Sequence, residues 1–210
     1  MRIRTLTFAT VLAALTAMPG LASTVTLNVV GGQLVGASNV EVNGALYDVE
    51  FVDGTCAALF DGCDAQSDFI FSTLDQALAA GRSLSETVFL DGPLGNFDSD
   101  PSLTAGIERS GPFSNQGTLL IPFAVVRDRA LAADFFNGSP DPIGGNDDRV
   151  SAGNSILISY DTSQTTRSVY ARFSPSDIAP VPLPAGGVLL LAGLVAFGAL
   201  RARRRSPTAS

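Results

Sequence analysis

Alternating apolar and polar positions mark the first part of the region between the two ends of the chain. Residues 24–30 are rich in β-branched side chains and partly alternate, a pattern typical of a strand. Two further alternating runs, 39–42 and 45–52, flank the dipeptide Asn43-Gly44. Both turn residues accept positive φ angles, so the sequence predicts a β-hairpin with a type I′ turn. On the second strand, we expect the face that carries Tyr47, Val49 and Phe51 to be buried.

The pattern then becomes helical over a short stretch. Residues 72–75 form a plausible capping box ahead of the apolar positions 77–80, and Gly81 either ends this helix or breaks it before 83–89. A second short helix is expected at 130–136.

Strands are expected again towards the end of the region. Residues 118–126 are apolar and strand-like, with Pro122 indicating a sheet edge or a bulge, and 155–160 and 168–173 are expected to pair with each other. The segments 91–117 and 140–153 have loop composition. The sequence therefore predicts an α+β or mainly β domain over residues 23–180, with an antiparallel sheet and one main helical region.

The two ends of the chain have targeting patterns. Residues 1–22 have a positive start, an apolar run and small residues before a cleavage point at Ser23, which is typical of a secretory signal peptide; a retained membrane anchor is the alternative. Near the other end, residues 185–200 are apolar and uncharged, and a basic cluster follows them. At about 1.5 Å per residue this run spans roughly 24 Å, which crosses a bilayer with some thinning or snorkelling. The cluster consists of Arg201, Arg203, Arg204 and Arg205.

The basic cluster is expected to stay cytoplasmic, which leaves the 23–180 domain outside the cytoplasm and anchored at the inner membrane. Ahead of the apolar run stand Val181, Pro182, Leu183, Pro184 and Ala185. This motif, with the apolar helix and the Arg cluster in order over 181–205, resembles the VPLPA-CTERM variant of the PEP-CTERM sorting signals. The resemblance implies recognition by an exosortase, cleavage near Pro184-Ala185, and transfer to the cell surface or extracellular matrix. A plain single-pass anchor is the alternative.

Charge and composition narrow the chemistry. The chain has 20 carboxylates and 13 basic residues, all Arg, with no His, Lys or Trp. Six Arg lie in the end segments. The middle of the chain therefore has seven Arg and all 20 carboxylates, and its formal charge is near −13. Such a charge disfavours nucleic acid as a partner. The missing His and Lys exclude Ser-His-Asp triads, histidine-bound zinc and Schiff-base chemistry, so carboxylate chemistry is what remains.

The two Cys residues, Cys56 and Cys63, predict a disulfide, because export places them in an oxidising compartment. A metal site is the alternative, although two Cys without His make a poor ligand set. A tentative calcium site is the one cofactor that the sequence suggests. Its candidate ligands lie in Gly-rich loops that do not fit an EF-hand, and turn formation is the alternative role for them: Asp98, Asp100, Asp141, Asp147 and Asp148.

These observations predict a non-catalytic surface or matrix protein that an exosortase sorts, with exopolysaccharide as a possible partner. A calcium-dependent adhesive or glycan-binding module is the second hypothesis, and a carboxylate-based hydrolase is the third.

Overall fold

The structure is a computed structural model that describes residues 24–109, 116–139 and 148–177. Residues up to Pro175 belong to one compact unit, and residues 176–210 belong to a second. No helix within the described ranges is long and apolar enough to cross a bilayer. The signal peptide at 1–22 and the sorting segment at 181–205 lie outside the described residues and stay predictions.

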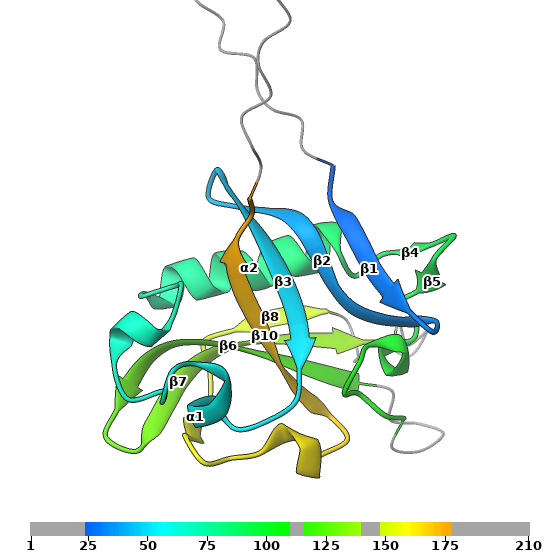
Figure 1. Cartoon of the computed structure of the whole chain (residues 1–210). Coiled ribbons are helices and arrows are strands. Elements are labelled where there is room, and N and C mark those ends of the chain that lie inside the picture. Colours follow the sequence, from blue (N-terminus) through cyan, green and yellow to red (C-terminus); the bar gives the residue numbers. More distant parts are fainter. Residues whose placement is uncertain (1–23, 110–115, 140–147, 178–210) are drawn as a thin grey trace, which may run out of the picture. The chain divides into compact units, whose positions relative to one another are not determined.

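A large, mostly antiparallel sheet forms the framework of the described residues (Figure 1). Its strand order is β1-β2-β3-β10-β6-β7-β8, and β9 also pairs with β7. The strands are β1 (Thr26–Val30), β2 (Gln33–Val42), β3 (Ala45–Val52), β6 (Gln116–Val126), β7 (Arg129–Gly138), β8 (Arg149–Ser151), β9 (Ser155–Leu157) and β10 (Ser168–Pro175). A separate small hairpin pairs β4 (Asp91–Gly92) with β5 (Gly95–Asn96). The expectation of a mainly β domain is confirmed.

The hairpin predicted at Asn43-Gly44 joins β2 to β3. Asn43 and Gly44 have φ angles of 52° and 82°, as a type I′ turn requires. On β3, Val49 and Phe51 are buried in the main core. Tyr47 is half-buried and packs against the same core, so the predicted inward face is confirmed.

Helix α2 (Leu74–Thr87) covers one face of the sheet. Its N-cap is Thr73, whose hydroxyl accepts from Gln76 N, while Gln76 Oε1 accepts from Ser72 N. The N-cap is thus one residue later than expected, and the returning bond of Gln76 goes to Ser72 rather than to the N-cap residue. The buried stripe of the helix packs against β2, β6, β7 and β8 and consists of Ala77, Ala80, Gly81 and Leu84.

The expectation that Gly81 ends or breaks the helix is wrong, because α2 runs through it for another turn and a half. A Cβ at Gly81 would lie 2.8 Å from Val150 Cγ1 on β8. Glycine is present here because helix and sheet approach closely, which sequence alone does not distinguish from a helix stop.

Two other expectations for the second half are also wrong. Residues 130–136 lie within β7, which pairs along its length with β6, so tertiary pairing overrides the helix-favouring alanines. The segments 155–160 and 168–173 do not pair with each other: β9 pairs with β7, and β10 lies between β3 and β6. Pro122 does mark a bulge, because the β6–β7 register shifts between Pro122 and Ala124.

The sheet separates two apolar clusters. The larger one lies between the sheet and α2, and it includes Leu119 of β6, Phe135 of β7 and Val169 of β10. The smaller one lies on the opposite face, beneath α1 (Cys56–Leu59), and includes Leu120 and Tyr170. Successive residues of β6, β7 and β10 therefore alternate between the two clusters, as the pleat of a strand requires.

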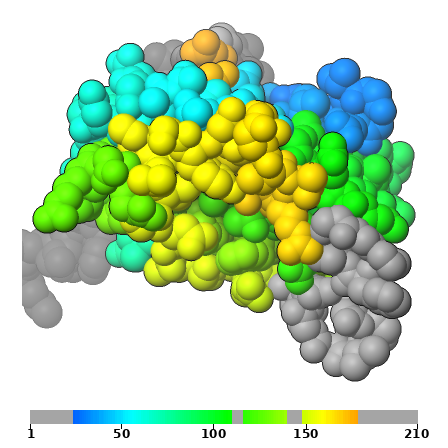
Figure 2. Space-filling model, turned by 90° about the horizontal axis from the view of Figure 1, so that it is seen from below, coloured from blue at the N-terminus to red at the C-terminus, as the bar shows by residue number. Residues whose placement is uncertain are grey.

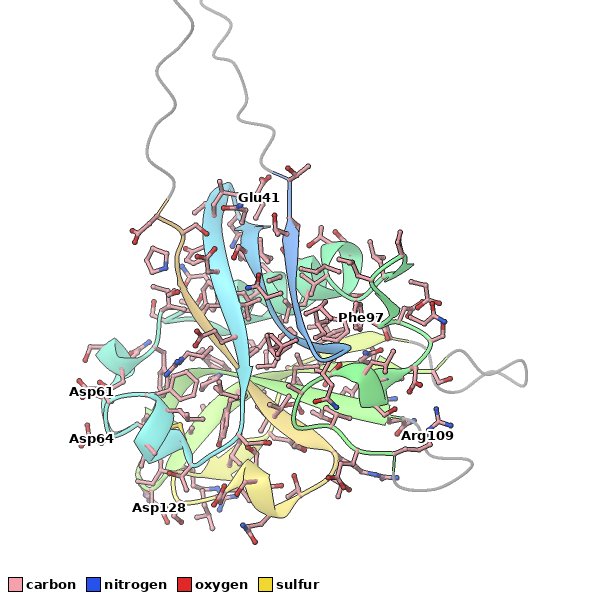
Figure 3. All side chains as sticks on the ribbon, turned by 45° about the vertical axis from the view of Figure 1, so that its right-hand side comes forward. Glu41, Asp61, Asp64, Phe97, Arg109 and Asp128 are labelled. Atoms are coloured by element: carbon pink, nitrogen blue, oxygen red, sulfur yellow. A yellow bond between two sulfur atoms is a disulfide. The ribbon has the colours of Figure 1, made fainter. Side chains whose placement is uncertain are left out.

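The start of β1 and the end of β10 lie at the same end of the sheet's strands (Figure 1). Thr26 is opposite Ser38, and Pro175 is opposite Tyr47, which is itself opposite Val40. The start of β10 lies at the other end of this strand. Figure 3 shows Glu41 of β2 near the start of β1 and the end of β10, with Asp128, in the turn between β6 and β7, on the far side of the molecule.

Candidate functional site

A pocket of about 360 Å³ lies on the sheet face opposite α2. Strands β6, β7 and β10 supply its floor, and the segment that contains β9 supplies one wall. Figure 2 views the molecule from the side where this segment, in yellow, lies at the surface. The lining residues are Thr118, Leu120, Arg129, Phe136, Asn154, Ser155, Ile156, Leu157, Tyr160 and Ser168.

The wall exists because the edge of the sheet is interrupted. Strands β8 and β9 both pair with β7, but residues 152–154 between them leave the ladder. Gly153 is pressed onto β7 so closely that a Cβ there would lie 1.1 Å from Ala132 O. The adjacent Asn154 O accepts from Ala132 N at 3.0 Å, which fixes Asn154 over β7. Interruptions of this kind re-aim side chains at sheet edges.

Asn154 is aimed at Asp134, a carboxylic acid in the middle of β7. Asp134 is only 2 % exposed, and its Oδ2 accepts a hydrogen bond from Asn154 Nδ2. Its Oδ1 has no partner among the described residues. Burial raises the pKa of Asp134 to about 6, against the opposing effect of hydrogen bonds from the backbone and side chain of Asn154. This acid therefore titrates close to neutral pH.

The pocket surrounds this acid without being lined by it. Leu120 is directly opposite Asp134 on β6, and Phe136 follows it on the same face of β7. Both residues line the pocket, as does Asn154. The buried acid thus lies beside the floor residues on the same face of the sheet, and Asn154 hydrogen-bonds to it.

Arg129 is the one charged side chain among the described residues that line the pocket. Its Nε donates to Ser155 Oγ at 2.6 Å, and its Nη2 donates to the carbonyl of Ser155. Two bonds to one neighbour fix the plane of the guanidinium. A second arginine, Arg149, lies 4.2 Å above the ring centroid of Phe136. Arg149 itself does not line the pocket, so Arg129 is the positive group that the described lining residues offer.

The smaller apolar cluster supports the pocket from beneath. Leu120 and Ile156 belong to this cluster and also line the pocket. The predicted disulfide, Cys56–Cys63, is confirmed and lies in the same cluster, with Cα atoms 5.6 Å apart and both residues fully buried. The bond therefore holds a loop against the floor of the site.

Tyr170 lies in this cluster as well. Its ring packs edge-on against Phe60 at 5.6 Å between centroids. Its hydroxyl has no hydrogen-bond partner within the described part of the chain, and burial is the main cause that raises its pKa to about 12.

The proposed calcium ligands are only partly described, since Asp141 and Asp147 lie outside the described residues. Asp98 is half-buried, and burial, with a contribution from the nearby Asp91 carboxylate, raises its pKa. Asp100 caps a 3₁₀ helix (Pro101–Leu103) and forms an ion pair with Arg109 at 3.1 Å.

Asp148 accepts hydrogen bonds from Ser85 Oγ at 3.2 Å and from Gly138 N at 3.1 Å. Over the described ranges, no three acidic or Cys side chains form a group able to hold a metal. Calcium binding stays a prediction. The sorting motif 181–185 and the Arg cluster 201–205 likewise lie outside the described residues.

Sequence reasoning missed Asp134, Asn154 and Arg129. A signal for Asp134 is present, since it is the single acid in the apolar run from Ala130 to Phe136. Placing it on a helix made it an ordinary surface acid. When residues 130–136 are placed on a strand that is paired on both sides, the alternation of side chains puts Asp134 on a covered face. Burying a charge there has a large unfavourable free energy.

Comparisons of the chain with family models, with curated proteins and with solved structures found no match in any of the three. Its function is therefore argued from the residues and geometry above.

Proposed function

We propose that this chain is an exported, non-catalytic protein of the cell surface or extracellular matrix, sorted by an exosortase through residues 181–205. The Cys56–Cys63 disulfide is the observation that carries the exported location. Both residues are 0 % exposed, and the bond is part of the packed domain. Disulfides of this structural kind persist in oxidising compartments outside the cytoplasm.

The end of β10, where the chain leaves the sheet, lies apart from the pocket. The chain leaves the sheet at the end of β10, and the pocket opens near the start of β10, at Ser168. Seven residues of strand at about 3.3 Å each separate these points by roughly 23 Å. The point at which the chain leaves the sheet and the pocket therefore lie at opposite ends of β10.

Intact mass of the protein purified from its native host tests the sorting proposal. We expect a mature chain that begins at Ser23 and ends near Pro184. A Pro182→Ala, Pro184→Ala double variant should keep the C-terminal segment, and a Pro207→Ala variant is the control. A wild-type mature protein that retains residues 201–205 would overturn the sorting proposal.

Ligand binding at the pocket is a second candidate function, and it favours the glycan-binding hypothesis. The pocket offers hydroxyl, amide and guanidinium groups around the half-exposed ring of Tyr160. Sites with a few convergent polar groups in a hollow of this size are typical of small-ligand recognition. A panel of neutral and acidic oligosaccharides tests it, with Thr118→Phe as a variant that fills the floor. Equal binding by wild type and Thr118→Phe would contradict a role for the pocket.

The two remaining hypotheses have separate tests. Calcium binding to the folded state predicts a rise in melting temperature with CaCl₂ that NaCl of equal ionic strength does not reproduce.

The hydrolase hypothesis predicts that the protein releases new reducing ends from a bound oligosaccharide, and that Asp134→Asn abolishes this release. Release of reducing ends by the wild type would replace the non-catalytic proposal.

A further inference from the structure

We propose that the pocket binds a hydroxyl-rich ligand and that Arg129 binds one singly charged carboxylate of this ligand, as a uronic acid residue would provide. The inference rests on the second candidate function, ligand binding at this pocket, and specifies the chemistry of the ligand.

The guanidinium of Arg129 is the group that would bind the carboxylate of the ligand. Two of the five N–H donors of its guanidinium are used on Ser155, and this pair of bonds holds the group at the pocket in a fixed orientation. A planar guanidinium with remaining donors matches a carboxylate, which accepts two parallel hydrogen bonds. Because the donor is already ordered by Ser155, binding costs less side-chain entropy.

The choice of a single negative charge comes from the charge balance around the pocket. Arg129 is the one ionised side chain among the lining residues, and none of the ten is an acid. Asp134 lies beside the floor residue Leu120, and Asp161 follows Tyr160 in the chain. A group with two charges, such as a phosphate monoester, would leave one charge unmatched near these acids.

The hydroxyl-rich character comes from the remaining groups. Thr118, Ser155 and Ser168 bring hydroxyls, and Asn154 brings an amide. These groups both donate and accept, as a sugar hydroxyl does. Leu157 and Tyr160 are 43 % and 36 % exposed and provide an apolar surface for the C–H face of a ring.

Binding of galacturonate oligomers to the full-length protein tests the inference. Titration calorimetry would compare trigalacturonate, monomeric galacturonate and the uncharged galactose trimer. We expect either acidic ligand to bind at least about tenfold more tightly than the neutral trimer, since charge-assisted hydrogen bonds contribute about 1.5–3 kcal/mol each. Tighter binding of the trimer than of the monomer would mark a polysaccharide as the source.

Arg129→Gln should weaken binding of the acidic ligand at least about tenfold. Arg127→Gln is the matched control, because it removes the same charge from an exposed turn position two residues away that does not line the pocket. It should leave binding nearly unchanged. Circular dichroism of both variants checks that they are folded.

Equal binding of the acidic and neutral trimers, or binding that survives Arg129→Gln, would overturn the ligand class. If Thr118→Phe still abolished that binding, the pocket would stand as a glycan site and only the carboxylate would be wrong. Failure of every acidic ligand to bind would also overturn the ligand class, whereas the wider oligosaccharide panel decides whether the pocket binds sugars at all.

Discussion

Asn154 Nδ2 donates a hydrogen bond to Asp134 Oδ2, joining an exposed residue of the pocket wall to a carboxyl that is 2 % exposed. This pair links the edge of the sheet to its interior. The segment that carries Asn154 also lines the pocket. The protonation state of Asp134 therefore affects both the stability of the protein and the shape of the pocket wall.

The first prediction concerns the pH dependence of stability. A carboxyl whose pKa is about 6 in the folded protein and 3.8 in the unfolded chain holds its proton more tightly when folded. Stability is therefore lost as pH rises from about 4 to about 6, and it is level above that. At about 1.4 kcal/mol per pH unit, the loss approaches about 3 kcal/mol.

Asp134→Asn should remove this loss and leave the variant more stable than the wild type at pH 8. Urea unfolding between pH 4 and pH 8 measures the difference. Asp128→Asn, at an exposed turn, is the control and should retain the decline. The raised pKa of Asp98 acts in the same direction, so the wild type and Asp134→Asn must be compared directly. Parallel curves for these two proteins would contradict the prediction.

The second prediction concerns Gly153. Any Cβ at this position collides with the Ala132 carbonyl, so Gly153→Ala must push residues 152–154 off β7. We expect a loss of about 3 kcal/mol in unfolding free energy, together with loss of ligand binding at the pocket. Gly92→Ala is the matched control, since nothing lies within 4 Å of a Cβ there. Similar stabilities for the two variants would contradict this assignment.

The third prediction separates helix propensity from packing at Gly81. Alanine is favoured over glycine by about 1 kcal/mol in a helix, yet Gly81→Ala should destabilise the protein because its Cβ meets Val150. In a Val150→Ala background, the same change should stabilise by up to about 1 kcal/mol. A double-mutant cycle by urea unfolding measures this coupling. An unchanged effect of Gly81→Ala in the second background would show that Val150 is not the obstacle.

The fourth prediction concerns the disulfide. Closing an eight-residue loop contributes about 2.5 kcal/mol in the chain-entropy account. A Cys56→Ala, Cys63→Ala variant should lose at least this much, since both residues are also buried in the cluster beneath the pocket. Reduction of the wild type should lower its stability by a comparable amount. Two reactive thiols in the unreduced, denatured protein would refute the bond.

Local chemistry accounts for the part of the fold that the sequence predicted. Asn43-Gly44 specifies its own turn, and the alternation over 45–52 specifies its buried face. Two Cys in a chain that is predicted to be exported indicate their bond. Each of these features depends on residues close together in the chain. Pro122 belongs with them, because its missing N–H marks a bulge wherever the strand lies.

The features that sequence reasoning missed depend on contacts between distant residues. Gly81 reads as a helix stop until Val150, which packs against it, is known. Residues 130–136 read as a helix until β6 pairs with them. The pocket arises from four separate segments, and Asp134 becomes unusual only when Asn154 covers it. Pairing of this kind is not encoded in local periodicity.

The start of β1 and the end of β10 lie at the same end of the strands, and this has a consequence for engineering. Only β2 and β3 separate these strands, a span of about 14 Å at about 4.8 Å per neighbouring pair. A linker of about five residues can bridge that span. The domain therefore suits circular permutation, with new ends at the exposed Arg127-Asp128 turn. It equally suits insertion into a surface loop of a host protein, which would display the pocket on a scaffold of choice.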